Sequence, residues 1–308
     1  MSEPVPIVSL PTPELETALN ALSCQANFVQ WDLQSPSPYS TIDIVVPPYM
    51  SSPKLLSALK GVKTKLVQSQ SVGFDGVADH LPKGHVFANA ASVHETSTAE
   101  LALGLIISSQ RGIKDFILAA DKGVWAPARY ESLADRTVLL VGYGGVAQAV
   151  EERLKGFEVN ILRVAKNART TENGEVHSLD KLHSLLAQAD IVVVAVPLNN
   201  ETVGLINEEF LSSMRDGALL VNISRGPVAL TAALVKEATN GRLRLALDVT
   251  DPEPLPNGHI LFSLPNVIIS PHVGGNSTAM TPRMARLIAL QVEKIQRGEG
   301  PVNVVLQS

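Results

Sequence analysis

One stretch of the sequence constrains the fold more than any other, because an apolar run leads directly into a glycine-rich turn. Val138–Val141 is the apolar run, and Gly142–Ala147, which reads Gly-Tyr-Gly-Gly-Val-Ala, follows it and opens an Ala/Val/Leu-rich segment. This order of strand, tight turn and helix is the one that a dinucleotide site needs. Gly142 permits the turn, Gly144 lets the backbone approach a pyrophosphate, and Ala147 is still small enough for close packing. The sequence predicts a dinucleotide site here, and the alternative is a glycine-rich turn in an ordinary α/β protein.

Short β-branched runs alternate with helical stretches along the chain, which is typical of parallel strands covered by helices on both faces. The predicted fold class is therefore α/β, with two doubly wound parallel-sheet domains. The first series of predicted strands is Ile7–Leu10, Phe28–Trp31, Ile42–Val46 and Leu66–Gln68. The second series, a full dinucleotide-binding sheet, is Val138–Val141, Val159–Val164, Ile191–Val196, Leu219–Ile223, Leu243–Leu247 and Val267–Ile269.

Amphipathic patterns predict the helices. Glu14–Leu22 and Lys54–Leu59 lie between strands of the first series. Glu95–Lys122 reads as one long helix that connects the domains. Ser277–Arg297 is expected to return the chain to the first domain, with residues 304–305 as a short tail.

Composition excludes several function classes. The formal charge of -5, with both signs mixed along the chain, provides no basic stripe that follows a phosphate backbone, so we expect no nucleic-acid partner. The single cysteine, Cys24, cannot form an intramolecular disulfide, which fits a reducing compartment. Residues 1–10 do not read as a signal peptide, and the apolar runs are far shorter than the ~20 residues that span a bilayer. We expect a cytoplasmic protein with no membrane partner.

The residues after the second predicted strand of the dinucleotide sheet indicate which cofactor is bound. An acid in this region usually holds the ribose hydroxyls of NAD. The window 160–169 has no carboxylate and three cations, Arg163, Lys166 and Arg169. Arginine binds phosphate through two parallel hydrogen bonds and lysine binds it as a point charge, so the window favours NADP(H) over NAD(H). The alternative is a solvated basic loop.

Polar side chains follow three apolar runs, at the strand ends where open α/β sheets bind ligands. Arg225 follows one run, Asp248 and Glu253 follow the next, and His272 follows the third. Reduction of a keto acid needs a proton donor, and histidine exchanges a proton near neutral pH, so His272 is the candidate acid and base. A carboxylate beside it favours the imidazolium, a part we assign to Glu253. Arg225 is the candidate for binding the substrate carboxylate bidentately.

Each of these residues also has a structural interpretation, as a loop stabiliser, a solvated acid or a capped loop histidine. His94, near the predicted domain connection, is a rival for the acid and base. No two of the other histidines have a spacing that indicates zinc, so we predict no metal site.

From about Leu66 onward the chain resembles the D-isomer-specific 2-hydroxyacid dehydrogenase family. Beside the glycine turn, residues 221–226 resemble the arginine motif of that family, residues 246–256 its glutamate motif, and residues 271–275 its histidine motif. All three occur in the order of the family. Ala147, the missing ribose acid and the first sixty or so residues depart from the pattern, which leaves the identity of the substrate open.

The resemblance implies a Rossmann cofactor domain inserted into a smaller, flavodoxin-like substrate domain. We expect the substrate domain to be residues 1–96 with 277–308, and the cofactor domain to be residues 97–276. It implies that Arg225, Glu253 and His272 are the catalytic set, and that the backbone at Val72 and Gly73 binds the substrate carboxylate. The expected cofactor contacts are Thr98, Gly142, Tyr143, Gly144, Gly145, Val146, Arg163, Lys166, Arg169, Val196, Pro197, Ile223, Asp248 and Gly274.

The function that the resemblance implies is NAD(P)-dependent reduction of a small 2-keto acid, of the glyoxylate or hydroxypyruvate type, to the D-2-hydroxy acid. A homodimer through the cofactor domain is also expected. Glu253 in place of glutamine argues against a formate dehydrogenase. The alternatives are a cofactor-sensing protein similar to the corepressors of this family, or a phosphoglycerate, phosphite or amino-acid dehydrogenase on the same scaffold.

Overall fold

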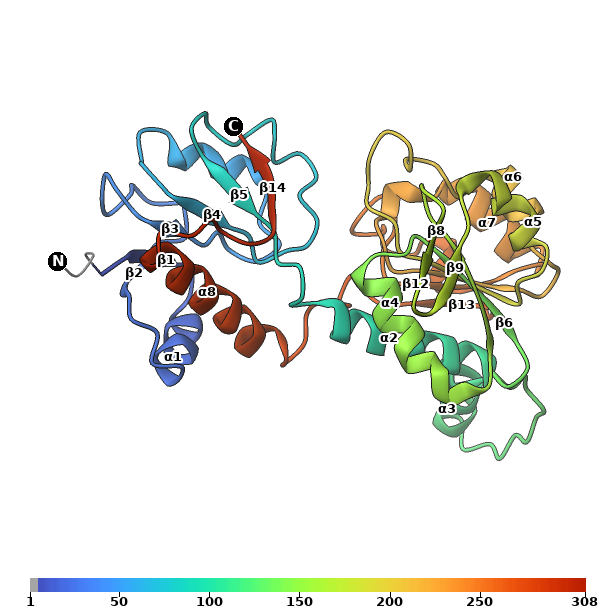
Figure 1. Ribbon diagram of the computed structural model, residues 1–308. Coiled ribbons are helices and arrows are strands. Elements are labelled where there is room, and N and C mark those ends of the chain that lie inside the picture. The colour runs from blue at the N-terminus through green and yellow to red at the C-terminus, as the bar shows by residue number, and fades with distance from the viewer. Residues whose placement is uncertain (1–4) are drawn as a thin grey trace. The chain divides into compact units, whose positions relative to one another are not determined.

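The computed structural model describes residues 5–308, which form two compact units (Figure 1). The first unit joins the segment that ends at His94 to Ser277–Ser308. The second unit is Glu95–Asn276, and it is therefore inserted into the sequence of the first. No helix among residues 5–308 has the length and apolar character needed to cross a membrane.

The first unit is built on a six-stranded sheet, in the order β14-β5-β4-β3-β1-β2. Its strands are β1 (Ile7–Leu10), β2 (Asn27–Gln30), β3 (Ile44–Val45), β4 (Leu66–Gln68), β5 (Val86–Ala88) and β14 (Val304–Gln307). Five of them are parallel, in the flavodoxin-like order 2-1-3-4-5, and β14 pairs antiparallel with β5. The prediction that residues 304–305 form a tail is thus wrong, because they belong to an edge strand.

Helices α1 (Pro13–Ala21) and α8 (Met280–Gln296) cover one face of this sheet (Figure 1). The opposite face is covered by η1 (Pro53–Leu59) and neighbouring loops, with Leu59 fully buried. The amphipathic pattern predicted at 54–59 is therefore a 3-10 helix. It begins after Ser52, whose hydroxyl accepts a hydrogen bond from the Lys54 backbone.

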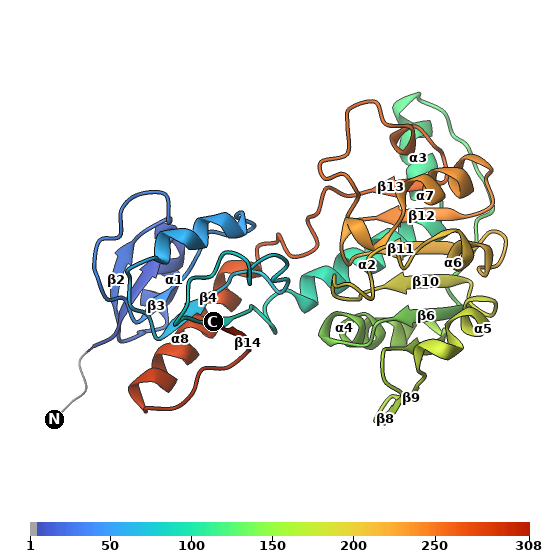
Figure 2. The same cartoon turned by 90° about the horizontal axis from the view of Figure 1, so that it is seen from above.

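The second unit contains a six-stranded parallel sheet in the order β13-β12-β11-β10-β6-β7 (Figure 2). Its strands are β6 (Thr137–Val141), β7 (Asn160–Val164), β10 (Ile191–Val194), β11 (Leu219–Asn222), β12 (Arg244–Leu247) and β13 (Val267–Ile269). All six predicted strands of this sheet are confirmed. The chain reverses its direction of winding between β6 and β10, so this is the point where a doubly wound sheet opens a crevice for a ligand.

Helices cover both faces of the second sheet (Figure 1). One face carries α2 (Glu95–Gln110) and α4 (Gly145–Leu154), and the other carries α5 (Leu182–Leu186), α6 (Glu208–Ser212) and α7 (Thr231–Thr239). A two-stranded hairpin, β8 (Arg169–Thr171) with β9 (Gly174–Val176), follows β7. Short 3-10 turns are η2 (Lys155–Phe157), η3 (Leu179–Lys181), η4 (Gly226–Val228) and η5 (Ile260–Phe262).

The prediction of one long helix over residues 95–122 is wrong. The helix ends at Gln110, and a separate helix, α3 (Ile113–Asp121), begins after Gly112. Gly112 has a left-handed φ of 64°, which no α-helix accommodates in its interior.

Candidate active site

The glycine turn lies at the reversal point of the second sheet, between β6 and α4. Gly142 has a left-handed φ of 86°, and a Cβ built there would lie only 2.5 Å from the carbonyl oxygen of Ala195, which follows β10. The turn can therefore pack against the neighbouring strand end only with glycine at this position.

The same turn fits the phosphates of a dinucleotide. Gly144 is the residue before α4, and a Cβ built on it would meet no atom within 4 Å, so the space beside the helix N-terminus is open. Backbone N–H groups and the positive end of the helix dipole favour a phosphate at such a terminus. Gly145 and Val146 form the first turn of α4, and the Tyr143 side chain is buried.

The three cations predicted for cofactor selection are in different environments. Lys166 is exposed and pairs with both carboxylate oxygens of Glu201, at 2.6 and 2.7 Å. Arg169 donates to the Tyr143 carbonyl at 2.7 Å and lies over the Tyr143 ring. Arg163 is held in an ion pair, because its Nε and Nη2 donate to the two carboxylate oxygens of Glu151 at 2.7 and 2.5 Å. The structure therefore brings Arg169 to the glycine turn and holds Arg163 in an internal ion pair.

The Arg163–Glu151 pair is a buried support for the glycine turn, and the sequence analysis missed it. The Glu151 side chain on α4 is only 3% exposed and also accepts the Tyr143 hydroxyl at 2.7 Å. Burial raises the pKa of Glu151, but hydrogen bonds from Arg163 and Tyr143 outweigh it and hold that pKa below its usual value. A signal existed in the sequence, since Glu151 shares the helical spacing of the buried residues Ala147, Val150 and Leu154 in α4.

Arg225 lies on a loop that follows β11 and is organised by a buried amide. Asn222 is fully buried, and its Oδ1 accepts from the backbone N–H of Ser224 at 3.1 Å and from its hydroxyl at 2.6 Å. The Arg225 Nη1 donates to the Ser224 carbonyl at 2.7 Å. A Cβ built on Gly226 would collide with the Thr250 carbonyl, so glycine is needed where this loop packs against the segment after β12. Asn222 is thus a second residue that the sequence analysis left unassigned.

Asp248, which follows β12, holds the loop that carries the candidate histidine. Its carboxylate accepts the Ser270 hydroxyl at 2.7 Å and the backbone N–H groups of Val273 and Gly274 at 3.0 and 2.9 Å. The Asp248 carbonyl accepts the His272 N–H at 2.7 Å. Both carboxylate oxygens are occupied by the loop, so the geometry supports a positioning role, and the predicted contact with the cofactor stays a prediction.

His272 and Glu253 are in contact, and the sequence predicted that this carboxylate would lie beside this histidine. The His272 Nδ1 lies 2.6 Å from the Glu253 Oε1, and both side chains are partly exposed. Because Nδ1 faces the carboxylate, it carries the proton and Nε2 is directed away from this bond. His272 has a left-handed φ of 52°, a conformation that few residues other than glycine adopt.

The other predicted cofactor contacts in the second unit cluster around these loops. Thr98 on α2 and Asp248 both lie beside Gly274. Val196 and Pro197 follow β10, and Ile223 follows β11 and is buried. Each of these residues is thus at or near the carboxyl edge of the second sheet.

Three predicted residues belong to the first unit. Val72 and Gly73 follow β4, and the Val72 carbonyl accepts a hydrogen bond from Asn89 at 2.9 Å. His94 is buried, stacks on Tyr49 with ring centroids 5.5 Å apart, and contacts the Gln70 carbonyl through Nε2 at 2.6 Å. These contacts favour a structural role for His94. Residues 5–308 contain no group of three or more metal-ligating side chains.

Solved structures with this fold cover nearly the whole chain. A D-isomer specific 2-hydroxyacid dehydrogenase from Xanthobacter autotrophicus, in complex with NADPH and MES, superposes with a TM-score of 0.84 at 24% identity and 98% coverage of both chains. An NADPH-dependent glyoxylate/hydroxypyruvate reductase from Sinorhizobium meliloti, in complex with NADP and sulfate, gives a TM-score of 0.82 at 22% identity and the same coverage. At these identities the likeness shows the two-domain Rossmann-type fold.

Sequence comparison shows the family. Residues 103–274 match the D-isomer specific 2-hydroxyacid dehydrogenase NAD binding domain. The glyoxylate reductase of Pyrococcus horikoshii is 35% identical over 256 residues, which cover 79% of this chain and 76% of that protein. The human glyoxylate reductase/hydroxypyruvate reductase is 32% identical over 297 residues, which cover 91% and 90%. This chain therefore belongs to the D-isomer specific 2-hydroxyacid dehydrogenases, a family of oxidoreductases.

Proposed function

We propose that this protein reduces a small 2-keto acid, of the glyoxylate and hydroxypyruvate type, to the D-2-hydroxy acid with NADPH as the preferred cofactor. The observation that carries the proposal is the 2.6 Å contact between His272 and Glu253, in the same unit as the open glycine turn. The curated relatives named glyoxylate reductase support the substrate class.

Each catalytic residue has one task in this proposal. The reduced nicotinamide supplies a hydride when it is bound. His272, as the imidazolium, gives its Nε2 proton to the oxygen of the keto group and becomes neutral, while Glu253 accepts a hydrogen bond from Nδ1–H throughout, which fixes the ring and stabilises the imidazolium. Arg225 binds the substrate carboxylate, and we assign the backbone of Val72 and Gly73 to the same carboxylate.

Lys166 and Arg169 are proposed to bind the 2′-phosphate that distinguishes NADPH from NADH. Lys166 and its partner Glu201 are both exposed, so Lys166 would exchange this weak surface pair for an incoming phosphate, and Arg169 is hydrogen-bonded to the glycine turn itself. Arg163 takes a structural part, because its charge is already paired with Glu151.

The experiment is a spectrophotometric screen of NADPH and NADH oxidation with glyoxylate, hydroxypyruvate, pyruvate and phenylpyruvate. We expect turnover with glyoxylate and hydroxypyruvate and a preference for NADPH. Tight nucleotide binding with no turnover on any acid would instead support a cofactor-sensing protein. Phosphite-dependent reduction of the oxidised cofactor, or oxidation of NADPH or NADH by a keto acid that requires ammonia, would support the other dehydrogenase classes.

We further propose a homodimer formed through the second unit. The helix α3 has no buried residue in the described chain, and it exposes Phe116, Ile117 and Leu118. Trp125, which follows it, is 92% exposed. Contiguous exposed apolar side chains of this kind mark interaction surfaces. Sedimentation of the full chain should give twice the monomer mass, and Ile117→Asp combined with Leu118→Asp should give the monomer.

A further inference from the structure

In the first unit, three consecutive backbone carbonyls are held by one neighbouring segment. They belong to residues 69–73, which follow β4 and which we call the β4 loop, and their donors lie in residues 89–94, which follow the neighbouring parallel strand β5. The Gln70 carbonyl accepts from His94 Nε2 at 2.6 Å, the Ser71 carbonyl from the Ala90 N–H at 2.9 Å, and the Val72 carbonyl from Asn89 Nδ2 at 2.9 Å.

These bonds determine the direction of two backbone N–H groups. In a trans peptide the C=O of one residue and the N–H of the next lie in one plane and point in opposite directions, and the peptides of the β4 loop are trans. The N–H groups of Val72 and Gly73 therefore point away from residues 89–90. Among residues 5–308 neither of these N–H groups donates a hydrogen bond, and both residues are partly exposed. Successive N–H groups in a bend of this kind form a concave anion site.

Of the three donors, Asn89 is the side chain that directs an N–H group with no partner. His94 holds the peptide that ends in the Ser71 N–H, but this N–H already donates to Ser69 Oγ at 3.0 Å. The second bond comes from a backbone N–H, so no side chain determines it. The third bond, from the Asn89 amide, sets the direction of the Gly73 N–H.

The chemistry of this position requires an amide. While Asn89 Nδ2 donates to the Val72 carbonyl, Asn89 Oδ1 accepts the Ala91 N–H at 3.2 Å. A carbonyl only accepts and an N–H only donates, so a single side chain must supply one donor and one acceptor here. Asn89 is also buried, which holds its amide in this orientation.

A buried network of amides fixes Asn89 in turn. Gln68 Nε2 donates to the Asn89 carbonyl at 3.0 Å and to the Ser69 carbonyl at 2.9 Å. Gln68 Oε1 accepts from Gln291 Nε2 at 2.8 Å, and both glutamines are fully buried. The Asn89 N–H donates to the Asn303 carbonyl at 3.0 Å. A buried polar network that is fully paired favours one conformation, so this network is suited to fixing a loop.

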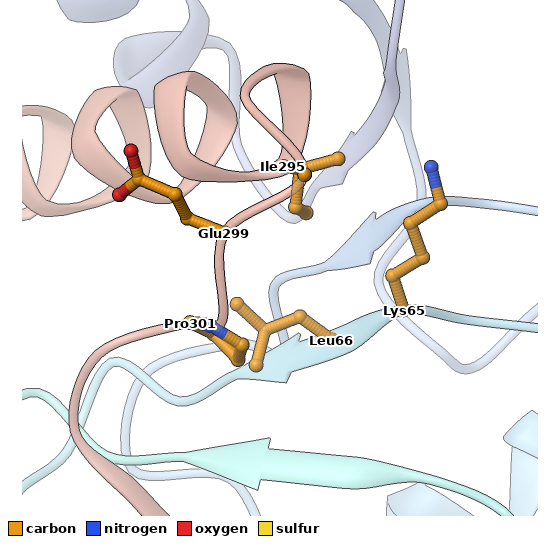
Figure 3. Close-up of a pocket in the computed structure, with 6 residues that line it drawn as sticks. Lys65, Leu66, Ile295, Glu299 and Pro301 are labelled. Atoms are coloured by element: carbon orange, nitrogen blue, oxygen red, sulfur yellow. The ribbon is translucent and has the colours of Figure 1, made fainter.

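The other end of β4 has a different character (Figure 3). A pocket of about 280 Å³ lies there, between the start of β4 and the end of α8, with apolar walls from Leu66, Ile295 and Pro301. Its two charged lining residues are each paired, Lys65 with Asp43 at 3.0 Å and Glu299 with Lys294 at 2.9 Å. This pocket has no excess charge of either sign, so it does not share the anion-binding character of the β4 loop.

We propose that Asn89 is a positioning residue for the substrate carboxylate. By holding the Val72 carbonyl, it directs the Gly73 N–H toward the carboxylate that the proposed function assigns to this backbone, and the inference rests on that function. Without the amide, the Val72 carbonyl would turn to water, because an unpaired carbonyl needs a donor and Val72 is partly exposed. The rigid peptide would then turn the Gly73 N–H inward and leave an oxygen facing the carboxylate.

Steady-state kinetics of the full-length protein with NADPH and glyoxylate test the proposal. Asn89→Leu keeps a similar volume and removes both amide contacts, and Asn89→Ala removes them without adding apolar atoms. We expect KM to rise by roughly tenfold or more, as the loss of a charged hydrogen bond predicts. The carboxylate keeps its charge during hydride transfer, so the contact binds substrate and transition state equally, and kcat should stay within about twofold.

Asn303→Gly is the matched control. Asn303 Nδ2 donates to the Ala91 carbonyl at 3.0 Å, and glycine accepts the left-handed φ of 58° at this position. The variant should lower the free energy of unfolding in urea and leave KM unchanged. A parent-like KM in both Asn89 variants, or an equal rise of KM in Asn303→Gly, would overturn the proposal, since Asn89 would then only stabilise the fold.

NMR observes the Gly73 N–H itself and does not depend on turnover. Labelling with ¹³C-carbonyl valine and ¹⁵N-glycine selects the four Val-Gly pairs of the sequence, and Val72→Ile identifies the Gly73 signal by removing it. The probe is oxamate, in which an amide group replaces the aldehyde of glyoxylate, added to the NADPH complex. The Gly73 proton should move downfield in the parent and in Asn303→Gly, but not in the Asn89 variants.

The two measurements separate this inference from the proposed function. If no keto acid is reduced, the proposed function fails, whereas a Gly73 shift that is lost in the Asn89 variants still supports the positioning role. If the parent reduces glyoxylate but oxamate does not move the Gly73 signal, the positioning role is wrong and the proposed function stands. A Gly73 shift of the same size in the parent and in the Asn89 variants would also overturn it.

Discussion

The backbone carbonyl of Asp248 accepts a hydrogen bond from the backbone N–H of His272 at 2.7 Å, and the Asp248 carboxylate holds the next two backbone N–H groups of the same loop. The strained left-handed backbone of His272 is thus fixed by one residue that follows the neighbouring strand. Together with the Glu253 contact, this fixes both the backbone and the ring of the proposed acid and base.

Asp248→Asn tests this positioning role. The NH₂ group of the new asparagine would face a backbone N–H whose hydrogen bond the Asp248 carboxylate accepts in the parent. Two donors would then face each other, and a buried donor without an acceptor lowers the stability of the fold by about 1 to 3 kcal/mol. We expect a lower free energy of unfolding and a lower kcat, with NADPH affinity little changed. Urea unfolding, steady-state kinetics and NADPH titration measure the three effects. Asp251→Asn, at an exposed position nearby, is the matched control and should behave like the parent. Weaker NADPH binding with normal kcat would instead make Asp248 a cofactor contact.

Arg225→Lys tests substrate binding. Lysine keeps the charge but cannot form the bidentate fork, so KM for the keto acid should rise and kcat should fall. NADPH affinity should stay near that of the parent, because the change lies outside the glycine turn. Parent-like kinetics on every accepted acid would remove Arg225 from the site.

Cofactor selection depends on Lys166 and Arg169. Replacing both by Ala should weaken NADPH far more than NADH, since each charged hydrogen bond that is lost is worth about 1.5 to 3 kcal/mol. Fluorescence titration with both cofactors measures the ratio. Glu201→Gln is the control, because it removes only the exposed partner of Lys166 and should not weaken NADPH. Equal affinity of the parent for NADPH and NADH would contradict the assignment.

Glu151→Gln tests the buried ion pair beneath the glycine turn. Removing one partner leaves Arg163 buried and unpaired, which costs about 3 to 5 kcal/mol of stability. Since the folded-state pKa of Glu151 is lowered, the parent has this stabilisation in full above the unfolded pKa of about 4.3 and loses it as the pH falls. The variant should therefore lose less stability than the parent between about pH 5 and 3. Urea unfolding across this range tests it, and parallel pH curves for the two proteins would refute it.

The sequence predicts the second sheet well because its four inner strands, β6, β10, β11 and β12, are short apolar runs that are buried on both faces. In β10, Ile191–Val194 has no exposed residue at all. The strands β5 and β14 were not predicted, and β14 is only half-buried, without the continuous burial that marks the inner strands of the second sheet. Their pairing depends on a contact between segments more than two hundred residues apart.

The candidate site also has parts that the sequence could predict and parts that it could not. The clustering of Arg225, Glu253 and His272 was predictable because each follows an apolar strand, and the topology brings such strand ends to one edge. The pairing of Arg163 with Glu151 was not predictable, because it depends on how α4 packs against β7. The three cations look equivalent in the sequence, and only packing distinguishes the buried Arg163 from the exposed Lys166.

The most direct test of the account is single-turnover reduction of hydroxypyruvate by NADPH, with chiral analysis of the product, for the parent and for His272→Ala. We expect one D-glycerate for each NADPH oxidised. His272→Ala should be slower by roughly a hundredfold to ten-thousandfold, the usual contribution of a positioned acid, with NADPH affinity retained. The L product, or a His272→Ala variant that reduces hydroxypyruvate at the parent rate, would contradict the account.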